Sequence, residues 1–181
     1  HAKVAVLDGG YRRWTTLGLP VDTQVKRLSP GYYSGHFDLS QIVDAAELEA
    51  RLAEPPGWLI DARAGERFRG DDEPIDRVAG HVPGAVNRPY TENLAPDGRM
   101  LPPAALADAF RGLLAGTPPE QAVLMCGSGV TACHNLLAME RAGLRGARLY
   151  AGSWSGWISD PTRPVATGAT GQVPPRRVQQ G

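Results

Sequence analysis

Residues 122–132 read Ala-Val-Leu-Met-Cys-Gly-Ser-Gly-Val-Thr-Ala, which sets Cys126 between a short apolar run and a helix-forming stretch. The run Ala122–Met125 predicts a buried strand, and the small residues that follow predict a tight loop. Gly127 and Gly129 allow the backbone to curl around the sulfur with its N–H groups turned inward at a helix start. Such an environment lowers the pKa of a cysteine from about 8.5 and favours the thiolate. A buried core cysteine is the alternative interpretation.

The composition is that of a globular protein. Of 181 residues, 42% are hydrophobic and 21% charged. Lys plus Arg equals Asp plus Glu at 19 each, so no overall positive field is available to hold nucleic acid or an anionic membrane. No apolar run approaches the roughly 20 residues that span a bilayer, and the start lacks a signal-peptide pattern. We therefore expect a cytoplasmic protein with no nucleic-acid or membrane partner, whose anion sites are local.

The cysteines and histidines indicate neither a disulfide framework nor a metal site. The chain has two cysteines, Cys126 and Cys133. Its four histidines are scattered along the sequence: His1, His36, His81 and His134. We therefore expect no bound metal. Cys133 is expected in the core of the helix after the loop, near Val130, Leu136 and Leu137, in preference to a role as a resolving thiol.

Apolar strands alternate with amphipathic helices along the chain. The expected elements are a helix opened by an Asp44–Glu47 capping box and running to about Leu52, a strand at Trp58–Ile60 that ends at Asp61, a short strand at Val86, a charged loop over Arg67–Arg77, and a helix over Ala104–Ala115. This alternation predicts an α/β fold, with a mostly parallel central sheet flanked by helices on both faces. Ligands then lie beyond the carboxyl ends of the strands, which is where Cys126 falls.

An internal repeat suggests how the chain is divided. Residues 6–14 and 149–157 share the pattern of a strand, a glycine turn and an aromatic-x-x-Trp segment, and each is followed by a Pro-Val pair. Because the second copy lies at the end of a domain, the first is expected to close a preceding domain; a chance likeness of two short units is the alternative. We predict a domain tail over residues 1–21, a linker over 22–35, a catalytic domain over 36–167 and a flexible C-terminal tail over 168–181.

Four motifs resemble those of the rhodanese family, in the order that this family shows. They are Asp61-Ala62-Arg63 with Glu66-Arg67-Phe68, Ala79-Gly80-His81-Val82-Pro83-Gly84-Ala85, the loop from Cys126 to Ala132, and Tyr150-Ala151-Gly152-Ser153-Trp154. The chain is most similar to the C-terminal catalytic half of two-domain thiosulfate or 3-mercaptopyruvate sulfurtransferases. The resemblance covers about residues 36–166 and implies the rhodanese-like fold.

The resemblance also implies an activity. In this family the cysteine at the position of Cys126 attacks the outer sulfur of a donor, thiosulfate or 3-mercaptopyruvate, and becomes a persulfide. The sulfur then passes to cyanide or to a thiol acceptor, such as thioredoxin or a low-molecular-weight thiol. No metal or organic cofactor takes part.

The resemblance assigns roles to individual residues. Cys126 and Ser128 are the catalytic candidates; the substrate-binding candidates are Arg67, Arg77, Gly127, Gly129, Val130 and Thr131; Asp61, Arg63 and His81 are structural supports. A guanidinium at Arg67 suits a carboxylate or thiosulfonate, whereas a surface ion pair with Glu66 or Asp71 is the alternative. The mercaptopyruvate enzymes read Glu-Pro-Arg in the loop where this chain has Glu73-Pro74-Ile75-Asp76-Arg77, so the motif does not identify the donor.

Two other functions compete with this interpretation. Cdc25-type phosphatases carry Cys-x5-Arg, so that the arginine holds the phosphate, and here the sixth residue after Cys126 is Ala132. The second competitor is a rhodanese-like regulatory or sulfur-carrier module with little turnover of small donors. Retention of Cys126 within a Gly-Ser-Gly loop favours chemistry over this module.

Overall fold

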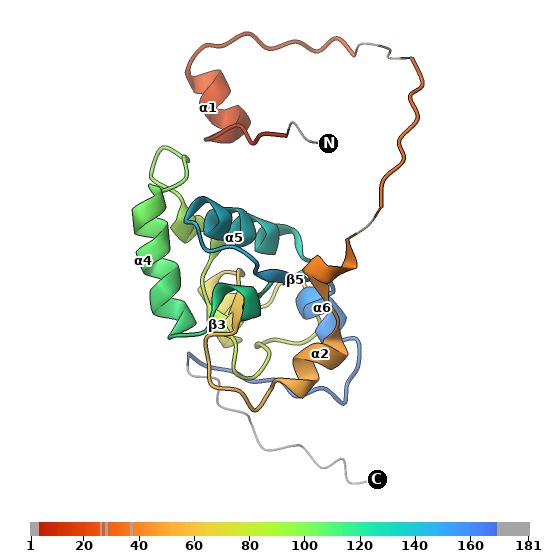
Figure 1. Ribbon diagram of the computed structural model, residues 1–181, viewed down its shortest axis with the longest axis vertical. Coiled ribbons are helices and arrows are strands. Elements are labelled where there is room, and N and C mark those ends of the chain that lie inside the picture. Colours follow the sequence, from red (N-terminus) through yellow and green to blue (C-terminus); the bar gives the residue numbers. More distant parts are fainter. Residues whose placement is uncertain (1–3, 26, 28, 37, 170–181) are drawn as a thin grey trace.

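A five-stranded, all-parallel sheet forms the centre of the protein (Figure 1). The computed structural model describes residues 4–25, 27, 29–36 and 38–169. The strands are β1 (Ile42–Val43), β2 (Leu59–Asp61), β3 (Val86–Asn87), β4 (Val123–Met125) and β5 (Arg148–Tyr150). Their order across the sheet is β1-β5-β4-β2-β3. The predicted α/β fold with a parallel sheet is confirmed.

Helices cover both faces of this sheet. They are α2 (Ala45–Ala50), α3 (Gly65–Arg69), α4 (Pro103–Leu114), α5 (Val130–Arg141) and α6 (Ser153–Trp157). A further helix, α1 (Gly10–Thr16), has no buried residue and covers neither face. Short 3-10 turns are η1 (Leu39–Gln41), η2 (Tyr90–Asn93) and η3 (Pro119–Gln121). Apolar side chains of α4 and α5 pack on one face, and those of α2, α3 and α6 pack on the other. Within the described part of the chain, no helix has the length and apolar character needed to cross a bilayer.

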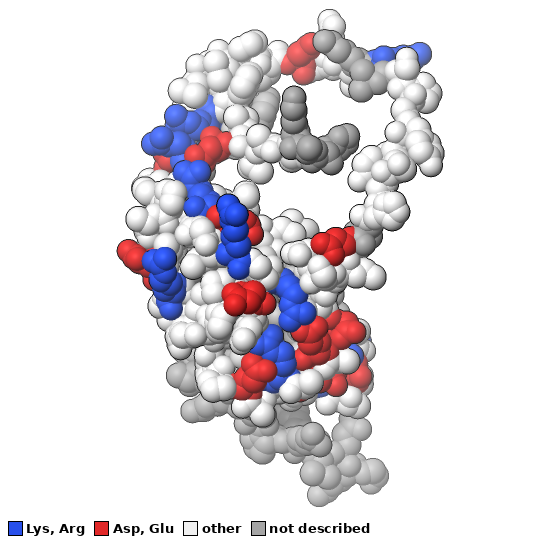
Figure 2. Space-filling model, viewed as in Figure 1, with Lys and Arg blue, Asp and Glu red and all other residues white. Residues whose placement is uncertain are grey.

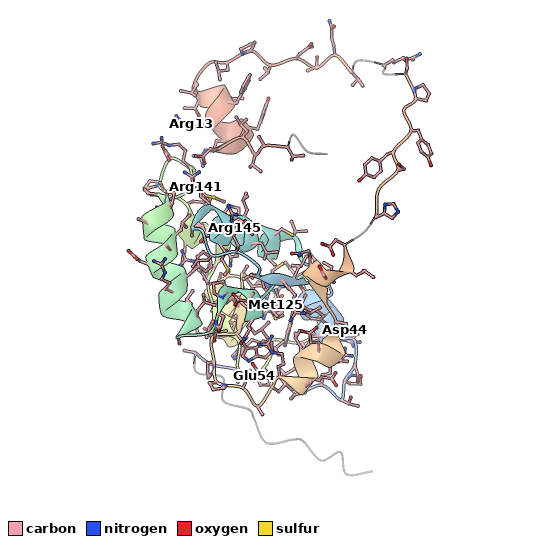
Figure 3. All side chains as sticks on the ribbon, in the orientation of Figure 1. Arg13, Asp44, Glu54, Met125, Arg141 and Arg145 are labelled. Atoms are coloured by element: carbon pink, nitrogen blue, oxygen red, sulfur yellow. The ribbon has the colours of Figure 1, made fainter. Side chains whose placement is uncertain are left out.

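The central strands supply side chains to both apolar layers. In β4, Val123 and Met125 face the layer with α2, α3 and α6, whereas Leu124 between them faces α4 and α5. Strands that are buried on both faces read as continuous apolar runs, which explains the sequence of this segment. Figure 3 shows Met125 in the interior and Asp44 at the start of α2. Cys126 continues the alternation and lies against the α4–α5 layer at the carboxyl end of β4.

Caps and turns define the helix boundaries, and one helix was not anticipated. The Asp44 carboxylate accepts the Glu47 N–H at 2.9 Å and so caps α2. The reciprocal half of the predicted capping box is not formed, because the Glu47 carboxylate pairs with Arg148. The loop expected over residues 67–77 begins only at Gly70, since α3 occupies residues 65–69. This helix is a single turn with no side-chain cap, which leaves little sequence signal.

The N-terminal segment forms only part of the structure expected from the repeat. The helix α1 is present, but residues 4–7 form no strand, and Val6 is 69% exposed. A strand needs a neighbouring strand for its backbone hydrogen bonds. In the second copy of the repeat, β5 has β1 and β4 beside it, whereas residues 4–7 form no strand. Two contacts tie the segment to the domain: the Met100 N–H donates to Asp8 Oδ1 at 2.9 Å, and Arg13 pairs with Asp97 at 3.5 Å. The proposed division into domains stays a prediction, and most of the expected C-terminal tail lies outside the described residues.

The prediction that Cys133 lies in the core is wrong. Its side chain is exposed on α5. The buried residues of this helix are Ala132, Asn135, Ala138 and Met139. Cys133 lies one position beyond this stripe, on the solvent side with Val130 and Leu137, which are 73% and 38% exposed.

His81 is fully buried behind α3. Its ring stacks on Phe68 with centroids 3.7 Å apart, and its Nδ1 lies 2.7 Å from the Phe68 carbonyl oxygen. Its backbone N–H and carbonyl pair with Ala166, at 2.8 and 2.9 Å. The ring therefore joins the turn after residue 80 to α3. The role of His81 as a structural support stays a prediction. Burial lowers the pKa of His81, with the Phe68 carbonyl and Asp61 opposing that effect.

We expect the free energy of unfolding to fall as pH drops below about 6.5, the pKa of an unfolded-chain histidine. Because the pKa of His81 is lower in the folded state, the unfolded chain binds more protons in this range and gains stability relative to the native state. Urea unfolding between pH 7.5 and pH 5.5 measures the change. His81→Gln should reduce the pH dependence, whereas His36→Gln, at an exposed position, should not. Equal pH dependence in the His81→Gln and unaltered proteins would contradict this assignment.

Candidate active site

The sulfur of Cys126 lies inside the loop that joins β4 to α5. Its side chain is only 2% exposed, and Sγ accepts the Gly129 N–H at 3.1 Å. Gly129 precedes the first residue of α5 and has φ +87°, a conformation that favours glycine. A side-chain carbon at this position would also lie 3.0 Å from the Ala151 carbonyl oxygen. The second glycine of the loop is therefore required both for its backbone conformation and for its close packing.

The loop holds the pKa of Cys126 below its ordinary value. Burial of the thiol acts in the opposite direction and is the largest single effect. Hydrogen bonds from the Thr131 hydroxyl and from the backbone N–H groups of Ala132, Ser128 and Thr131 together outweigh it. The positive end of the α5 dipole lies at the same place and favours the same charge state. The site therefore stabilises a buried thiolate.

A second layer of hydrogen bonds fixes the backbone of Cys126. Its N–H donates to Ser153 Oγ at 3.0 Å, and its carbonyl oxygen accepts the Trp154 N–H at 2.9 Å. The Ser153 hydroxyl in turn donates to the Tyr150 carbonyl oxygen at 2.9 Å. Ser153 is fully buried with φ +49°, a strained conformation for a residue with a side chain. The start of α6 thus fixes the backbone position of Cys126.

A pocket of about 280 Å³ opens onto this loop. Its lining residues are Ala62, Arg63, Ala64, Arg67, Tyr90, Cys126, Gly127, Ser128, Val130 and Thr131. Six of the predicted catalytic and substrate-binding residues therefore line one cavity. Arg63, which was expected only as a structural support, lines it as well. Its volume suits a small molecule.

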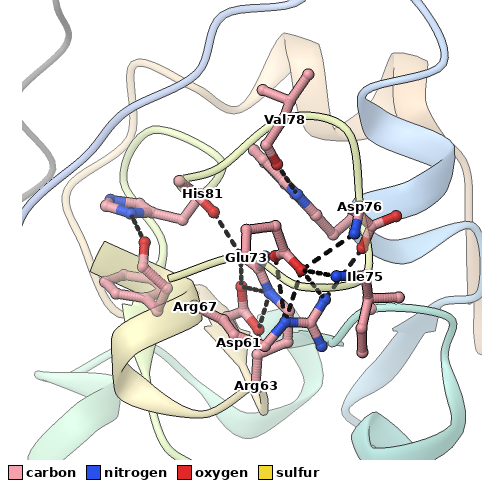
Figure 4. Close-up of polar contacts among 12 residues, drawn as sticks. Asp61, Arg63, Arg67, Glu73, Ile75, Asp76, Val78 and His81 are labelled. Atoms are coloured by element: carbon pink, nitrogen blue, oxygen red, sulfur yellow. Dashed lines mark hydrogen bonds and ion pairs between the residues drawn. The ribbon is translucent and has the colours of Figure 1, made fainter. Parts of the chain in front are cut away.

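Arg67 reaches the pocket from α3, and its guanidinium is 16% exposed (Figure 4). It pairs with Glu73 at 2.8 Å and with Asp76 at 3.1 Å. The alternative interpretation named Glu66 or Asp71 as the partner of Arg67, and neither of them pairs with it. Asp71 pairs with Arg69 instead. The Nη1 and Nη2 atoms lie 3.6 and 3.7 Å from the place where a side-chain carbon on Gly127 would be. An arginine therefore lies directly beside the cysteine loop.

Arg63 and Asp61 form a buried ion pair beneath the pocket, at 2.7 Å (Figure 4). The Arg63 side chain also donates to the Gly80 carbonyl oxygen at 2.7 Å and lies over the Trp154 ring, 4.6 Å from its centroid. Its Nη1 reaches Glu73 at 3.4 Å. The pair joins the end of β2 to the turn before His81. The role of both residues as structural supports stays a prediction.

Arg77 does not lie at this pocket. Its guanidinium donates to the carbonyl oxygens of Ile158 and Ser159, at 2.6 and 3.4 Å. It lines two other hollows instead, neither of which includes Cys126. A contact between Arg77 and a small molecule at Cys126 stays a prediction that this arrangement does not support. Gly129 does not line the pocket either, but its N–H meets the sulfur.

Sequence reasoning missed some of the residues that shape the site. Tyr90 lines the pocket from η2, with its ring in edge contact with His134 at 5.4 Å between centroids. The only signal was an aromatic residue after the proline in the segment 86–90. Ser153 is part of a family motif, but the motif does not reveal its hydrogen bond with the Cys126 N–H. Glu73 matches the family's Glu-Pro-Arg pattern and Asp76 lies in the part that departs from it. The pairing of both carboxylates with Arg67 depends on a fold of the loop that spacing does not reveal.

Charges of both signs are mixed on the face of the molecule shown in Figure 2, so no broad field of one sign covers it. Among the described residues, no group of three or more His, Cys, Asp or Glu side chains is arranged to hold a metal ion. The chemistry available at the pocket is that of a thiolate beside a guanidinium.

A parallel sheet whose carboxyl edge carries a buried cysteine in a loop of N–H donors defines the class of this α/β protein. The chain belongs to the family of rhodanese-like domains, because the model of this family matches residues 44–160. The family resemblance drawn from the four motifs is confirmed.

Relatives with assigned names are sulfurtransferases. A probable 3-mercaptopyruvate sulfurtransferase of Pseudomonas aeruginosa is 54% identical over 165 residues, 91% of this chain and 58% of that protein. A putative thiosulfate sulfurtransferase, SseB, of Mycobacterium tuberculosis is 41% identical over 92% of this chain and 58% of its own length. Mouse 3-mercaptopyruvate sulfurtransferase is 35% identical over 87% and 53%. The chain thus spans somewhat more than half the length of these relatives.

Solved structures agree on the fold. An anaerobic ergothioneine biosynthesis enzyme from Chlorobium limicola superposes with a TM-score of 0.75 at 22% identity, over 90% of this chain and 41% of that one. The wild-type structure of EanB gives a TM-score of 0.75 at 21% identity, over 90% and 40%. At this level of identity the likeness concerns the fold alone.

Replacing Thr131 by Val should raise the pKa of Cys126, because its hydroxyl is a donor to the sulfur and the opposing burial remains. The rate of alkylation of Cys126 by iodoacetamide, followed by peptide mass as a function of pH, measures the midpoint. Thr16→Val on the exposed helix α1 is the matched control and should leave the midpoint unchanged. An unchanged midpoint in Thr131→Val would mean that the hydroxyl does not stabilise the thiolate.

Gly129→Ala should destabilise the protein by about 1–3 kcal/mol, because it forces a side chain into positive φ and against the Ala151 carbonyl. Gly127→Ala is the control from the same loop: its side-chain carbon would meet only the Arg67 guanidinium, at ordinary contact distance. Thermal unfolding of the two variants measures the difference. Equal losses of stability in the two alanine variants would contradict the prediction, because they would show that backbone conformation at Gly129 is not the cause.

Proposed function

We propose that this protein is a sulfurtransferase that carries sulfane sulfur on Cys126. The observation that supports this most directly is the sulfur of Cys126, buried among N–H donors that lower its pKa, at the base of a small pocket with Arg67 in its wall. The names of the relatives, 3-mercaptopyruvate and thiosulfate sulfurtransferases, support the same chemistry.

In the proposed first step the thiolate attacks the outer sulfur of the donor. With thiosulfate, the S–S bond breaks and sulfite leaves with the electron pair. With 3-mercaptopyruvate, the C–S bond breaks, the electron pair passes to carbon, and the proton of the donor thiol ends on that carbon in pyruvate. Both routes leave a persulfide anion on Cys126. The N–H groups that favour the thiolate suit this anion as well, because they supply partial positive charge without transferring a proton.

In the second step a thiolate acceptor or cyanide attacks the distal sulfur, and Cys126 is released as a thiolate. Ser128 and Thr131 line the pocket beside Cys126, and the Thr131 hydroxyl is a hydrogen-bond donor to the Cys126 sulfur. We infer that Thr131 stabilises the anion in both steps. We infer that Ser128, which is exposed and lines the pocket, donates to the group that leaves the donor.

The test is the intact mass of the protein before and after addition of thiosulfate and, separately, of 3-mercaptopyruvate. A gain of about 32 Da, one sulfur atom, that is lost on adding cyanide is expected. Cys126→Ser should abolish the gain, and Cys133→Ser, at the exposed cysteine of α5, should keep it. No adduct from either donor on a folded protein would favour the regulatory or sulfur-carrier module over the enzyme.

A further inference from the structure

The guanidinium of Arg67 is shared between two carboxylates before any ligand reaches it (Figure 4). Its Nε donates to both oxygens of Glu73, at 2.9 and 3.1 Å, and its Nη2 donates to Asp76 Oδ2 at 3.1 Å. Within the described part of the chain, Nη1 makes no hydrogen bond. The arginine therefore offers the pocket one side of its fork, with much of its charge already compensated.

Glu73 and Asp76 differ in what else they hold. The Glu73 side chain is 3% exposed, reaches Arg63 and accepts the backbone N–H groups of Ile75 and Asp76, both at 3.1 Å. Glu73 therefore stabilises the conformation of its own loop. The Asp76 carboxylate, 10% exposed, meets only Arg67 and the hydroxyl of Ser155, at 2.8 Å, among the described side chains. An amide at position 76 can keep the hydroxyl contact while losing the charge.

Ser155 connects Asp76 to the cysteine loop. Its N–H donates to the Gly127 carbonyl oxygen at 3.0 Å, and its Oγ lies 3.0 Å from the same oxygen. Asp76 is thus held at a fixed place next to the residue that follows Cys126. Its charge acts at the pocket from a defined position and not from a freely moving surface side chain.

The charges around the pocket set how strongly it attracts anions. Beside the two guanidiniums of Arg63 and Arg67 lie three carboxylates: Asp61, Glu73 and Asp76. The thiolate adds a further negative charge. Coulomb repulsion is proportional to the charge of the approaching group, so each carboxylate opposes a dianion about twice as strongly as a monoanion.

We propose that Asp76 is a positioning residue that sets donor specificity: by holding and neutralising Arg67, it makes the pocket select monoanionic sulfur donors, such as a 3-mercapto-2-oxo acid, over dianionic donors, such as thiosulfate. This inference rests on the proposed function of the same pocket. It also agrees with a pocket that is lined by Arg63 and Arg67, both already paired with carboxylates, while Arg77 lies elsewhere.

The decisive experiment compares two alkylating agents at Cys126, the anion iodoacetate and the neutral iodoacetamide. The ratio of their rate constants reports the potential at the sulfur, and the fraction of thiolate cancels from it. Asp76→Asn should raise the iodoacetate-to-iodoacetamide ratio by roughly threefold or more, since one negative charge near the pocket is removed. Rates are followed on the Cys126 peptide by mass spectrometry, which separates it from Cys133.

Two variants control this result. Asp76→Glu restores the charge and should return the ratio toward that of the unaltered protein. Asp72→Asn removes the same charge from an exposed position on the same loop and should leave the ratio unchanged. An unchanged ratio in Asp76→Asn, or an equal rise in Asp72→Asn, would overturn the proposal. Thermal unfolding shows whether each variant is folded.

Donor kinetics give the second readout. Asp76→Asn should raise kcat/KM for thiosulfate relative to that for 3-mercaptopyruvate by a similar factor, through a lower KM for thiosulfate. A merely structural role would lower kcat for both donors together and leave their ratio unchanged, which would overturn the proposal. If no donor is turned over by the unaltered protein, the proposed function fails, while the alkylation ratio still decides whether Asp76 controls the charge of the pocket.

Discussion

The buried ion pair between Asp61 and Arg63 is the interaction on which the site depends. Asp61 ends β2, and Arg63 extends from it to the Gly80 carbonyl, to Glu73 and over the Trp154 ring. Removing one partner of such a pair typically costs about 3–5 kcal/mol, because the other charge stays buried without compensation. The loop that carries Glu73 therefore has one position in which all these groups are satisfied. Arg67 takes its place at the cysteine pocket because that loop is fixed.

The chemistry of Cys126 results from competition between two effects of the same burial. Removal from water disfavours the thiolate, and the loop N–H groups and the Thr131 hydroxyl reverse this because they are already oriented. Ser153, strained and fully buried, and Gly129, at positive φ, both keep this orientation. The arrangement does not need to reorganise when charge develops on sulfur, which is the condition under which fixed dipoles are most effective.

The sequence allowed the sheet and the cysteine loop to be predicted, because both depend on local signals. Apolar runs bounded by glycine and proline identified β2 and β4, and the Gly-Ser-Gly run placed Cys126 at a strand end. What could not be predicted depends on contacts between distant segments. The exposure of Cys133 follows from a one-residue difference in helix phase, and the partners of Arg67 follow from the path of the loop over residues 70–78. The missing strand at residues 4–7 shows that an apolar run becomes a strand only beside a pairing partner.

The strand order affects how this domain folds during its synthesis on the ribosome. β5 is the last strand to be synthesised, yet it lies between β1 and β4 and is the partner of β1 in the register Ile42–Leu149 and Val43–Tyr150. Until residue 150 has emerged, β1 has no neighbour, and Ser153 and Trp154 are not yet present to hold the backbone of Cys126. Long-range pairing of this kind slows folding and leaves strand edges open during synthesis. Cys126 therefore acquires its environment only at the end of translation of the domain.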